Sequence, residues 1–223
     1  MRRLDWLKQL YRPVTPARMI LIFILASLLG NLIETIFCGI LEGAWGSRQG
    51  VVYGPFSPIY GIGAVLLILL MLPLAQGSPL LLFLTGALVG GGYEVLGSLL
   101  ESHVLHSTSW NYGSWGLPLL GGRTSVAFMV MWGLISVVWM RWLYPALNAQ
   151  LDALRPGPMR AVAYLLGGLM AADLLISGLA LERWSDRMFG HPADTQLEIF
   201  LDHHYPNSRM EPLFSNLRFS QSP

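Results

Sequence analysis

Two glutamates lie well inside long apolar stretches of the chain, at Glu34 and Glu94. A charged side chain at the centre of a bilayer costs about 2.5–3.5 kcal/mol on insertion scales, so each glutamate must face the interior of a helix bundle and find a partner. If the two carboxyl groups share one site, the pKa of one of them rises, and the pair can hold a proton or a cation. The alternative is that each is a structural glutamate, protonated or hydrogen-bonded near the outer end of its helix.

A second acidic residue follows each of these glutamates, at Glu42 and Glu101. A solvated helix end is the favoured explanation for both, and the alternative is that Glu101 belongs to a ligand- or ion-binding site. Arg123 opens a later apolar stretch and is expected to pair with Glu94 or Glu101, or to bind an anionic ligand. A bidentate arginine–carboxylate pair would suit either role. His103 and His106 lie near Glu101, but three residues without secured geometry are weak evidence for a metal, so no metal site is predicted.

Two aromatic loops interrupted by glycine and proline follow the acidic stretches: YGPFSPIYG at 53–61 and YGSWGLPLLG at 112–121. This mixture suits neither a helix interior nor a plain strand, so it predicts irregular backbone at a membrane surface. Such backbone is tolerated at membrane depth only where it is buried in protein or lines a cavity. Tyrosine and tryptophan also collect at membrane interfaces because their rings are amphipathic. The aromatic residues that could form the mouth of a site are Tyr53, Tyr60, Trp110 and Tyr112.

These features recur in the same order, which indicates an internal repeat. Glu34 and Glu94 are 60 positions apart, whereas Tyr53 and Tyr112 are 59 positions apart. In the loops, Pro58 matches Pro118 at a separation of 60. Repetition at a fixed period is the signature of a duplicated unit, although chance similarity between helices rich in leucine and glycine is the alternative. We predict two tandem helix–loop–helix units, residues 19–76 and 77–145.

The composition indicates an integral membrane protein: of 223 residues, 53% are hydrophobic and 12% charged, against about 25% charged in average soluble domains. The net charge of +1 gives no basic excess that would suggest nucleic-acid binding. Lys8 is the only lysine, which excludes a Walker-type phosphate loop. Any ATP hydrolysis would therefore come from a separate ATPase subunit. The sequence identifies no cofactor.

Five apolar runs are long enough to cross a bilayer of about 30 Å, which predicts an all-α membrane protein in contact with membrane lipids. The predicted spans are residues 19–41, 59–75, 80–104, 124–144 and 159–181. A basic leader (1–18) precedes them, residues 146–183 hold a linker and the fifth helix, and 184–223 form a polar tail, either a folded cap or a surface arm. The excess of arginine and lysine in the leader and linker predicts a cytoplasmic N-terminus with both aromatic loops and the tail outside. The two units would then be parallel repeats about an axis along the membrane normal.

The stretches RQGVVYGPFSPIYGIGA and SWNYGSWGLPLLGGR, followed by Trp132-Gly133, resemble the CmpB-like, type IV ABC-transporter permease family of bacterial membrane proteins. The resemblance covers about residues 30–145, and YGPF…PIYG is its most specific motif. It implies a multi-spanning, permease-like protein of the bacterial inner membrane. The family usually has cysteine where Ser57 stands and Trp-Asp-Tyr-Ser at 110–113, so a role for that aspartate is not carried over. Only the linker around 145–158 could meet an ATPase subunit.

The sequence therefore predicts a polytopic protein that binds or moves a small solute or ion through Glu34 and Glu94, with Arg123 as the counter-charge. One alternative is a membrane-embedded enzyme or processing factor acting on lipid or envelope substrates, with a carboxylate as general acid or base. That function would require the carboxylates and Arg123 to line a groove open sideways to lipid. A second alternative is a structural or regulatory membrane subunit without a pocket.

Overall fold

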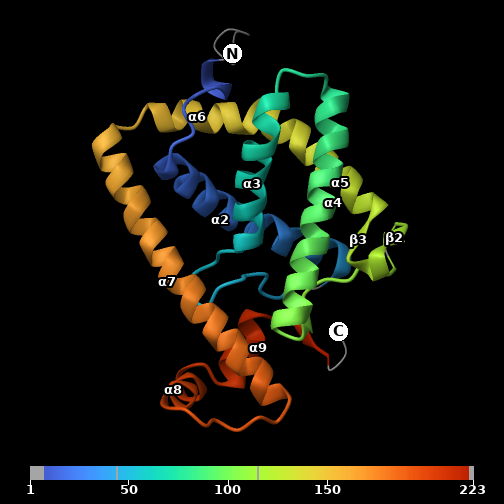
Figure 1. Cartoon of the computed structure of the whole chain (residues 1–223), viewed down its shortest axis with the longest axis vertical. Helices are drawn as coiled ribbons and strands as arrows, with labels where there is room; N and C mark the ends of the chain where they lie inside the picture. Colours follow the sequence, from blue (N-terminus) through green and yellow to red (C-terminus); the bar gives the residue numbers. More distant parts are fainter. Residues whose placement is uncertain (1–7, 44, 115, 221–223) are drawn as a thin grey trace.

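The computed structural model is almost entirely helical and describes residues 8–43, 45–114 and 116–220 (Figure 1). The first seven residues of the predicted leader lie outside the described residues. The helices are α2 (Pro16–Glu42), α3 (Pro58–Met71), α4 (Pro79–Val104), α5 (Val126–Val138), α6 (Tyr144–Asp152), α7 (Pro156–Met188), α8 (Gln196–His204) and α9 (Asn207–Leu213). Short 3-10 turns occupy Leu72–Leu74 and Leu120–Gly122, and a π-helical turn occupies Trp139–Leu143. Two-residue strands form two antiparallel pairs: β1 (Ser107–Thr108) with β4 (Arg218–Phe219), and β2 (Pro118–Leu119) with β3 (Thr124–Ser125).

Within the described residues, four helices are long and apolar enough to cross a membrane: residues 16–41, 79–104, 126–152 and 156–188. The all-α membrane class is thus confirmed. The remaining predicted span, α3, is a shorter apolar helix of 14 residues extended by one 3-10 turn. At 1.5 Å per residue its α-helical part is about 21 Å long, less than the thickness of the hydrocarbon core.

Proline and hydroxyl side chains fix where the helices begin. Pro16, Pro58 and Pro79 each occupy the first turn, where the missing N–H would have no intrahelical partner. Thr15 and Ser78 cap two of these helices, each accepting a hydrogen bond from a backbone N–H three residues later. The sequence placed these starts within three residues because the same prolines interrupt the apolar runs.

Glycines let the two hairpins, α2–α3 and α4–α5, pack closely in the same manner. A side-chain carbon on Gly30 would come within 2.2 Å of the Tyr60 ring, and one on Gly90 within 2.1 Å of the Trp132 ring. Two further contacts repeat this correspondence: Gly61 against Phe23, and Gly133 against Phe83. Small residues at such positions are what membrane helices use for close approach.

These contacts correct the alignment of the two loops. The first helices of the hairpins correspond at a separation of 60 positions, as the sequence predicted, but Tyr60 and Trp132 correspond at 72. The second hairpin therefore has 12 (72 − 60) additional residues before its return helix. Pro58 begins α3, whereas Pro118 lies in β2, so their matching in sequence is not a structural equivalence.

Helix α6 lies across one end of the molecule, beside the N-terminal segment and the α3–α4 turn (Figure 1). The sequence treated this region as an irregular linker, but it continues from α5 through the π-helical turn. Asp152 at its end binds both Arg12, at 2.7 Å, and Arg18. Asn148 donates a hydrogen bond of 2.9 Å to the carbonyl of Gln9. These bonds fix α6 to the start of α2.

The polar tail folds as a cap at the other end, which we name the cap end (Figure 1). Arg183, at the end of α7, makes two hydrogen bonds of 2.9 Å to the carboxylate of Asp202 in α8. Arg187 adds a third contact to Asp202, at 2.5 Å. A second core lies beneath the cap, formed by Val52, Ala180, Trp184, Leu201, Tyr205, Met210, Phe214 and Leu217. The structure thus decides between the two predicted forms of the tail in favour of a folded cap.

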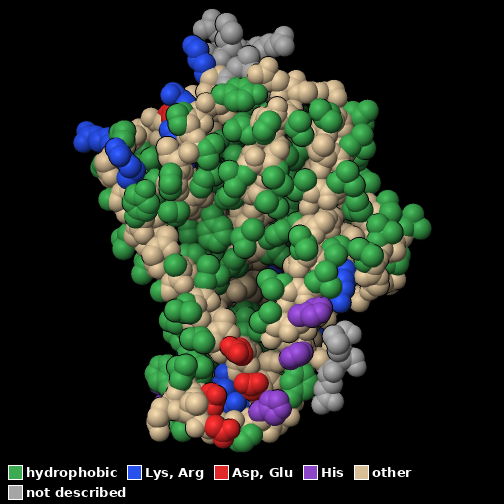
Figure 2. Space-filling model, viewed as in Figure 1, with side chains coloured by type: hydrophobic (Ala, Val, Ile, Leu, Met, Phe, Trp, Pro, Cys, Tyr) green, Lys and Arg blue, Asp and Glu red, His purple; other side chains and the backbone are tan. Residues whose placement is uncertain are grey.

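Apolar side chains cover the broad middle of the molecule, as Figure 2 shows for one face. Basic side chains lie at both ends, but few acidic residues accompany them at the α6 end, whereas acidic residues and histidines gather at the cap end. Exposed leucine, isoleucine and valine side chains between these ends belong to all the long helices. This distribution is that of a protein embedded in a bilayer with its two ends in water.

Candidate intramembrane carboxylate site

Glu94 is the most deeply buried acidic residue among the described residues, with 6% of its surface exposed. It lies in the middle of α4 and accepts two hydrogen bonds, one on each carboxylate oxygen. The Thr124 hydroxyl donates to Oε2 at 2.7 Å, and the Tyr112 hydroxyl donates to Oε1 at 3.1 Å. Both donors come from the loop between α4 and α5, so the loop folds back onto the helix that carries the carboxylate.

The backbone of this loop is held by its own bonds. The N–H of Tyr112 donates to the carbonyl of Gly122 at 2.8 Å, and Gly122 adopts a positive φ of 85° that favours glycine. The Tyr112 ring stacks on Phe128 with centroids 3.8 Å apart. The Trp110 indole donates to the carbonyl of Arg123 at 3.2 Å. Irregular backbone at membrane depth persists only when its polar groups are satisfied in this way.

Glu34 is half-buried on α2 and accepts a hydrogen bond from the Tyr60 hydroxyl. The Tyr60 ring lies over Gly30, one helical turn before Glu34, so the glycine makes room for the ring that reaches the carboxylate. Electrostatic interactions extend from Tyr60 to Tyr112 and from Tyr112 to Glu34. Glu34–Tyr60 and Glu94–Tyr112 are therefore neighbouring pairs, and we call these four residues the carboxylate–tyrosine cluster.

The hydroxyl of Tyr112 remains protonated across the physiological range. Burial raises the pKa of Tyr112 well above its ordinary value, and the nearby carboxylate of Glu94 raises it further. A neutral tyrosine is a hydrogen-bond donor to a carboxylate, but it does not cancel the charge. The cluster can thus position Glu94 without neutralising it.

Arg123 does not pair with either predicted carboxylate. Its Nη1 donates to the hydroxyls of Ser98, at 2.9 Å, and Ser102, at 3.2 Å, which lie one turn apart on α4. Glu101 instead accepts hydrogen bonds from two hydroxyls, that of Ser107 in β1 at 3.2 Å and that of Ser109, just after β1, at 2.7 Å. The expectation of an Arg123–carboxylate pair is therefore wrong for the described residues, because two serines occupy the face of α4 that Arg123 reaches.

Tyr53 lies away from the cluster, in contact with the cap. Its N–H donates to the carboxylate of Asp173 in α7 at 3.1 Å, and its hydroxyl is 2.9 Å from that of Tyr205. The guanidinium of Arg209 lies over the Tyr53 and Tyr205 rings, 5.5 and 4.9 Å from their centroids. Asp173 also accepts a hydrogen bond from Ser177, whereas Arg183, further along α7, binds Asp202.

Trp110 also has a supporting position, packed against Gly97 of α4. The sequence analysis missed Thr124, whose hydroxyl makes the shortest bond to Glu94. The signal available for it was weak: a threonine immediately after the only arginine of the second loop. No group of three or more histidine, cysteine, aspartate or glutamate residues in the described part of the chain could hold a metal ion.

Residues 21–178 match the model of the family described as "Putative ABC-transporter type IV". The chain belongs to this family. The range that matches the ABC-transporter type IV family runs from α2 through most of α7, so it includes both hairpins and the whole carboxylate–tyrosine cluster. Much of the cap lies beyond it. Searches of curated proteins and of solved structures found no match to the chain.

In this member of the ABC-transporter type IV family, each hairpin contributes one carboxylate and one tyrosine to a shared region. For Glu94, whose hydrogen-bond donors Tyr112 and Thr124 are neutral, an added proton or cation is favoured, because an uncompensated charge in an apolar bundle is costly. The chemistry available to the cluster is therefore the uptake and release of positive charge.

Proposed function

We propose that this protein is a carrier component of the bacterial inner membrane that binds a proton or a small cation at Glu34 and Glu94 and thereby binds or moves a small solute. The observation that carries the proposal is that each carboxylate is bonded to a tyrosine, Glu34 to Tyr60 and Glu94 to Tyr112. Each carboxylate comes from the first helix of a hairpin, so a change in charge at the cluster would act on the interface between the two hairpins.

Two properties of Glu94 support a change of charge rather than a purely structural role. It is buried at membrane depth, and the groups that donate hydrogen bonds to it, the hydroxyls of Tyr112 and Thr124, are neutral. A structural carboxylate in such a place is normally paired with a cation. The nearby Arg123 is held by serines instead. The neutralising charge would then come from solution.

Family membership supports a separate ATPase subunit as partner. Helix α6 is the element that we propose would meet it, because α6 lies across the end of the bundle that the arginine distribution assigns to the cytoplasm. Its bonds to Arg18 and Gln9 would transmit a movement of α6 to the start of α2, the helix that carries Glu34.

The enzyme alternative is not favoured by the geometry. It needs carboxylates and Arg123 along a groove open to lipid, but the open groove between α2, α3 and α7 is lined by apolar residues. If the following experiment finds no charge-dependent binding, it will support the second alternative, a structural or regulatory subunit.

The test is thermal unfolding of the purified protein across pH and in lithium, sodium and potassium salts. A ligand present at 100 times its Kd stabilises by about 2.7 kcal/mol, which shifts the midpoint measurably. We expect Glu34→Gln and Glu94→Gln to lose the response to protons or cations, whereas Glu182→Gln, an exposed residue of α7, keeps it. If both glutamine variants respond as the wild type does, the carboxylates are not the binding site.

Flux into proteoliposomes then separates binding from transport. The wild type should accumulate the responding cation, or acidify the lumen, at least tenfold faster than either glutamine variant. A protein that binds but shows no flux, alone or with ATPase added, would have a sensing or structural role.

A further inference from the structure

An apolar groove of about 430 Å³ runs between α2, α3 and α7, on the side of the molecule away from α4 and α5. Helix α2 forms its floor with residues such as Phe23, and α3 and α7 form its walls with residues such as Leu66 and Leu174. Helices α2 and α7 cross at Gly167, where a side-chain carbon would lie 3.0 Å from Ile20. Figure 1 shows α7 and α3 separating toward the α6 end.

The groove lies within the membrane-spanning part and presents almost no polar surface, so its occupant is a hydrocarbon rather than a polar solute. Ligand sites for small polar molecules place several convergent polar groups among their apolar walls. The eleven residues that line this groove include no charged, amide or hydroxyl side chain. An acyl chain needs no hydrogen-bonding partner and fits these walls.

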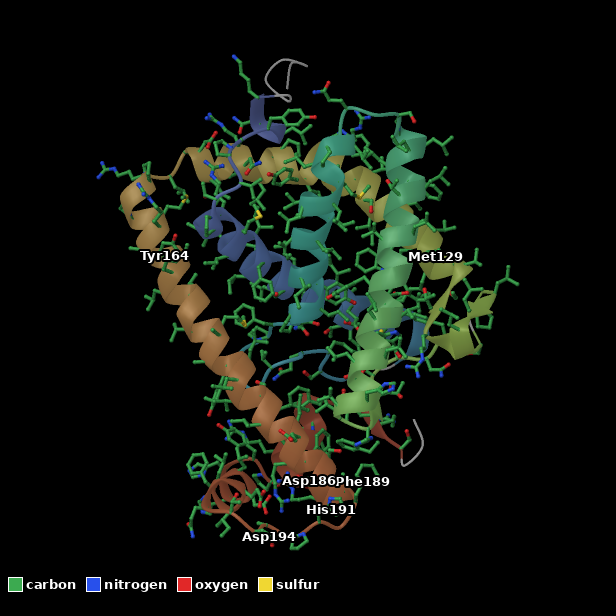
Figure 3. All side chains as sticks on the ribbon, viewed as in Figure 1. Met129, Tyr164, Asp186, Phe189, His191 and Asp194 are labelled. Carbon is green, nitrogen blue, oxygen red and sulfur yellow. The ribbon has the colours of Figure 1, made fainter. Side chains whose placement is uncertain are left out.

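Arg160 places a positive charge on α7, beyond the groove toward the α6 end. It lies seven residues before Gly167, and residues seven apart share one face of a helix, the face that also carries Ala171 and Leu174. The rise of about 1.5 Å per residue places it about 10 Å nearer the α6 end. Tyr164, labelled in Figure 3, marks the turn of α7 between them. The Arg160 side chain is exposed, and its Nε bonds the carbonyl of Pro156 in its own helix.

Three arginines lie near the α6 ends of α2 and α7. Arg12 and Arg18 share the carboxylate of Asp152, whereas Arg160 has an exposed side chain. Arg160 is therefore the arginine on the groove side of α7 that can attract a negatively charged headgroup, because basic residues near a membrane surface attract anionic lipids.

We propose that this groove binds one anionic phospholipid, with an acyl chain between α3 and α7 and its phosphate at Arg160. The lipid would join α7, with its cap, to the first hairpin. The site is separate from the carboxylate–tyrosine cluster, and it stands whether or not the protein transports a solute.

The experiment is native mass spectrometry of the full chain, delipidated in detergent and titrated with dioleoyl phosphatidylglycerol or dioleoyl phosphatidylcholine. The wild type should bind one phosphatidylglycerol molecule about fivefold more tightly than phosphatidylcholine, the ratio that corresponds to about 1 kcal/mol. Ala171→Phe fills the groove and should weaken binding of both lipids at least tenfold. Ala172→Phe places the same ring on the exposed neighbouring face and should bind as the wild type does.

Arg160→Gln tests the headgroup contact without touching the core, since its side chain is exposed. It should abolish the preference for phosphatidylglycerol and leave binding of phosphatidylcholine unchanged. Arg155→Gln is the matched control, because Arg155 lies at the same end of α7 on another face, and it should keep the preference. Wild-type binding by Ala171→Phe, or an unchanged preference in Arg160→Gln, would overturn the proposal. So would a wild-type dimer that Ala171→Phe converts to a monomer, because the groove would then hold a second copy.

Discussion

Tyr112 joins the loop of the second hairpin to a buried charge, and each part of its side chain has a separate task. Its ring stacks on Phe128, which positions the loop, and its hydroxyl donates to Glu94. Removing the hydroxyl alone therefore separates packing from chemistry.

We expect Tyr112→Phe to lower the free energy of unfolding by about 1 kcal/mol, the usual net value of one hydrogen bond. It should also alter the response of stability to protons or cations, because Glu94 loses a donor. Tyr93→Phe is the control, since the Tyr93 hydroxyl donates to the carbonyl of Ile59 at 2.8 Å. Thermal unfolding at several pH values measures both effects. Equal responses in the two variants would show that the Tyr112 hydroxyl is only a packing contact.

The glycines of α4 give a second prediction, because they differ in what surrounds them. A side-chain carbon on Gly90 would meet the Trp132 ring, whereas one on Gly92 would meet nothing within 4 Å. We expect Gly90→Ala to destabilise by about 1–3 kcal/mol through overpacking. Gly92→Ala should be neutral or stabilising by up to about 1 kcal/mol, because alanine is the better helix former. Thermal unfolding of the two variants side by side checks this, and equal stability would contradict the close packing of α4 on α5.

At the scale of single residues, the sequence indicated the carboxylates but not their partners. Glu34 and Glu94 stand out because a charged side chain within a membrane-spanning helix costs free energy, whichever direction that face of the helix points. The partners of Arg123 depend on the rotation of α4 about its axis, which places Ser98 and Ser102 beneath the arginine. A rotation of this kind is set by packing between helices, and the period of one helix alone does not reveal it.

At the scale of elements, the long helices could be predicted from apolar runs that end at prolines, but α6 could not. Pro145 and the polar residues after it indicated a break. Proline is tolerated in the first turn of a helix, however, and here it lies at the start of α6. The π-helical turn before it redirects the chain without ending the helical backbone. The 12 additional residues of the second loop were equally hidden, because this loop contains the two-residue strands β2 and β3, which are too short to show a periodic pattern.

The cap is an element whose stability should depend on pH. The two arginines beside Asp202 hold the pKa of that carboxyl below its ordinary value, the bonds from Arg183 contributing most. A carboxyl whose pKa is lower in the folded protein than in the unfolded chain stabilises the fold at pH values above the unfolded pKa of about 3.9. This stabilisation is lost as the pH falls through the folded-state pKa. We expect Asp202→Asn to weaken the cap at pH 7 by about 1.5–3 kcal/mol, the range for hydrogen bonds to charged groups.

Thermal unfolding and limited proteolysis of the tail at pH 7 and below pH 4 measure this dependence. The difference between wild type and Asp202→Asn should shrink on acidification, because the wild-type carboxyl also loses its charge. Asp194→Asn, in the turn before α8, should behave as the wild type does at both pH values. A difference that persists unchanged in acid would mean that the asparagine disturbs packing instead.

At the scale of the whole molecule, the two ends differ in net charge, and this difference predicts the orientation of the protein in the membrane. Basic residues at the α6 end have few acidic neighbours, whereas those at the cap end lie among the acidic residues and histidines seen in Figure 2. The excess of arginine and lysine on short segments marks the cytoplasmic side. The carboxylate–tyrosine cluster lies nearer the cap end, since Glu34 is eight residues from the end of α2 and Glu94 ten from the end of α4.

Labelling of single cysteines in intact cells tests this orientation. Cys38 is buried and is replaced by serine to give a background without thiols. Ser208 in α9 and Gln150 in α6 are exposed at opposite ends, so each can carry the only cysteine. We expect a maleimide that cannot cross the inner membrane to label Ser208→Cys from outside, and to label Gln150→Cys only after lysis. The reverse pattern would place α6 outside and the loops inside. It would also remove the argument that α6 meets an ATPase subunit, because ATP is hydrolysed in the cytoplasm.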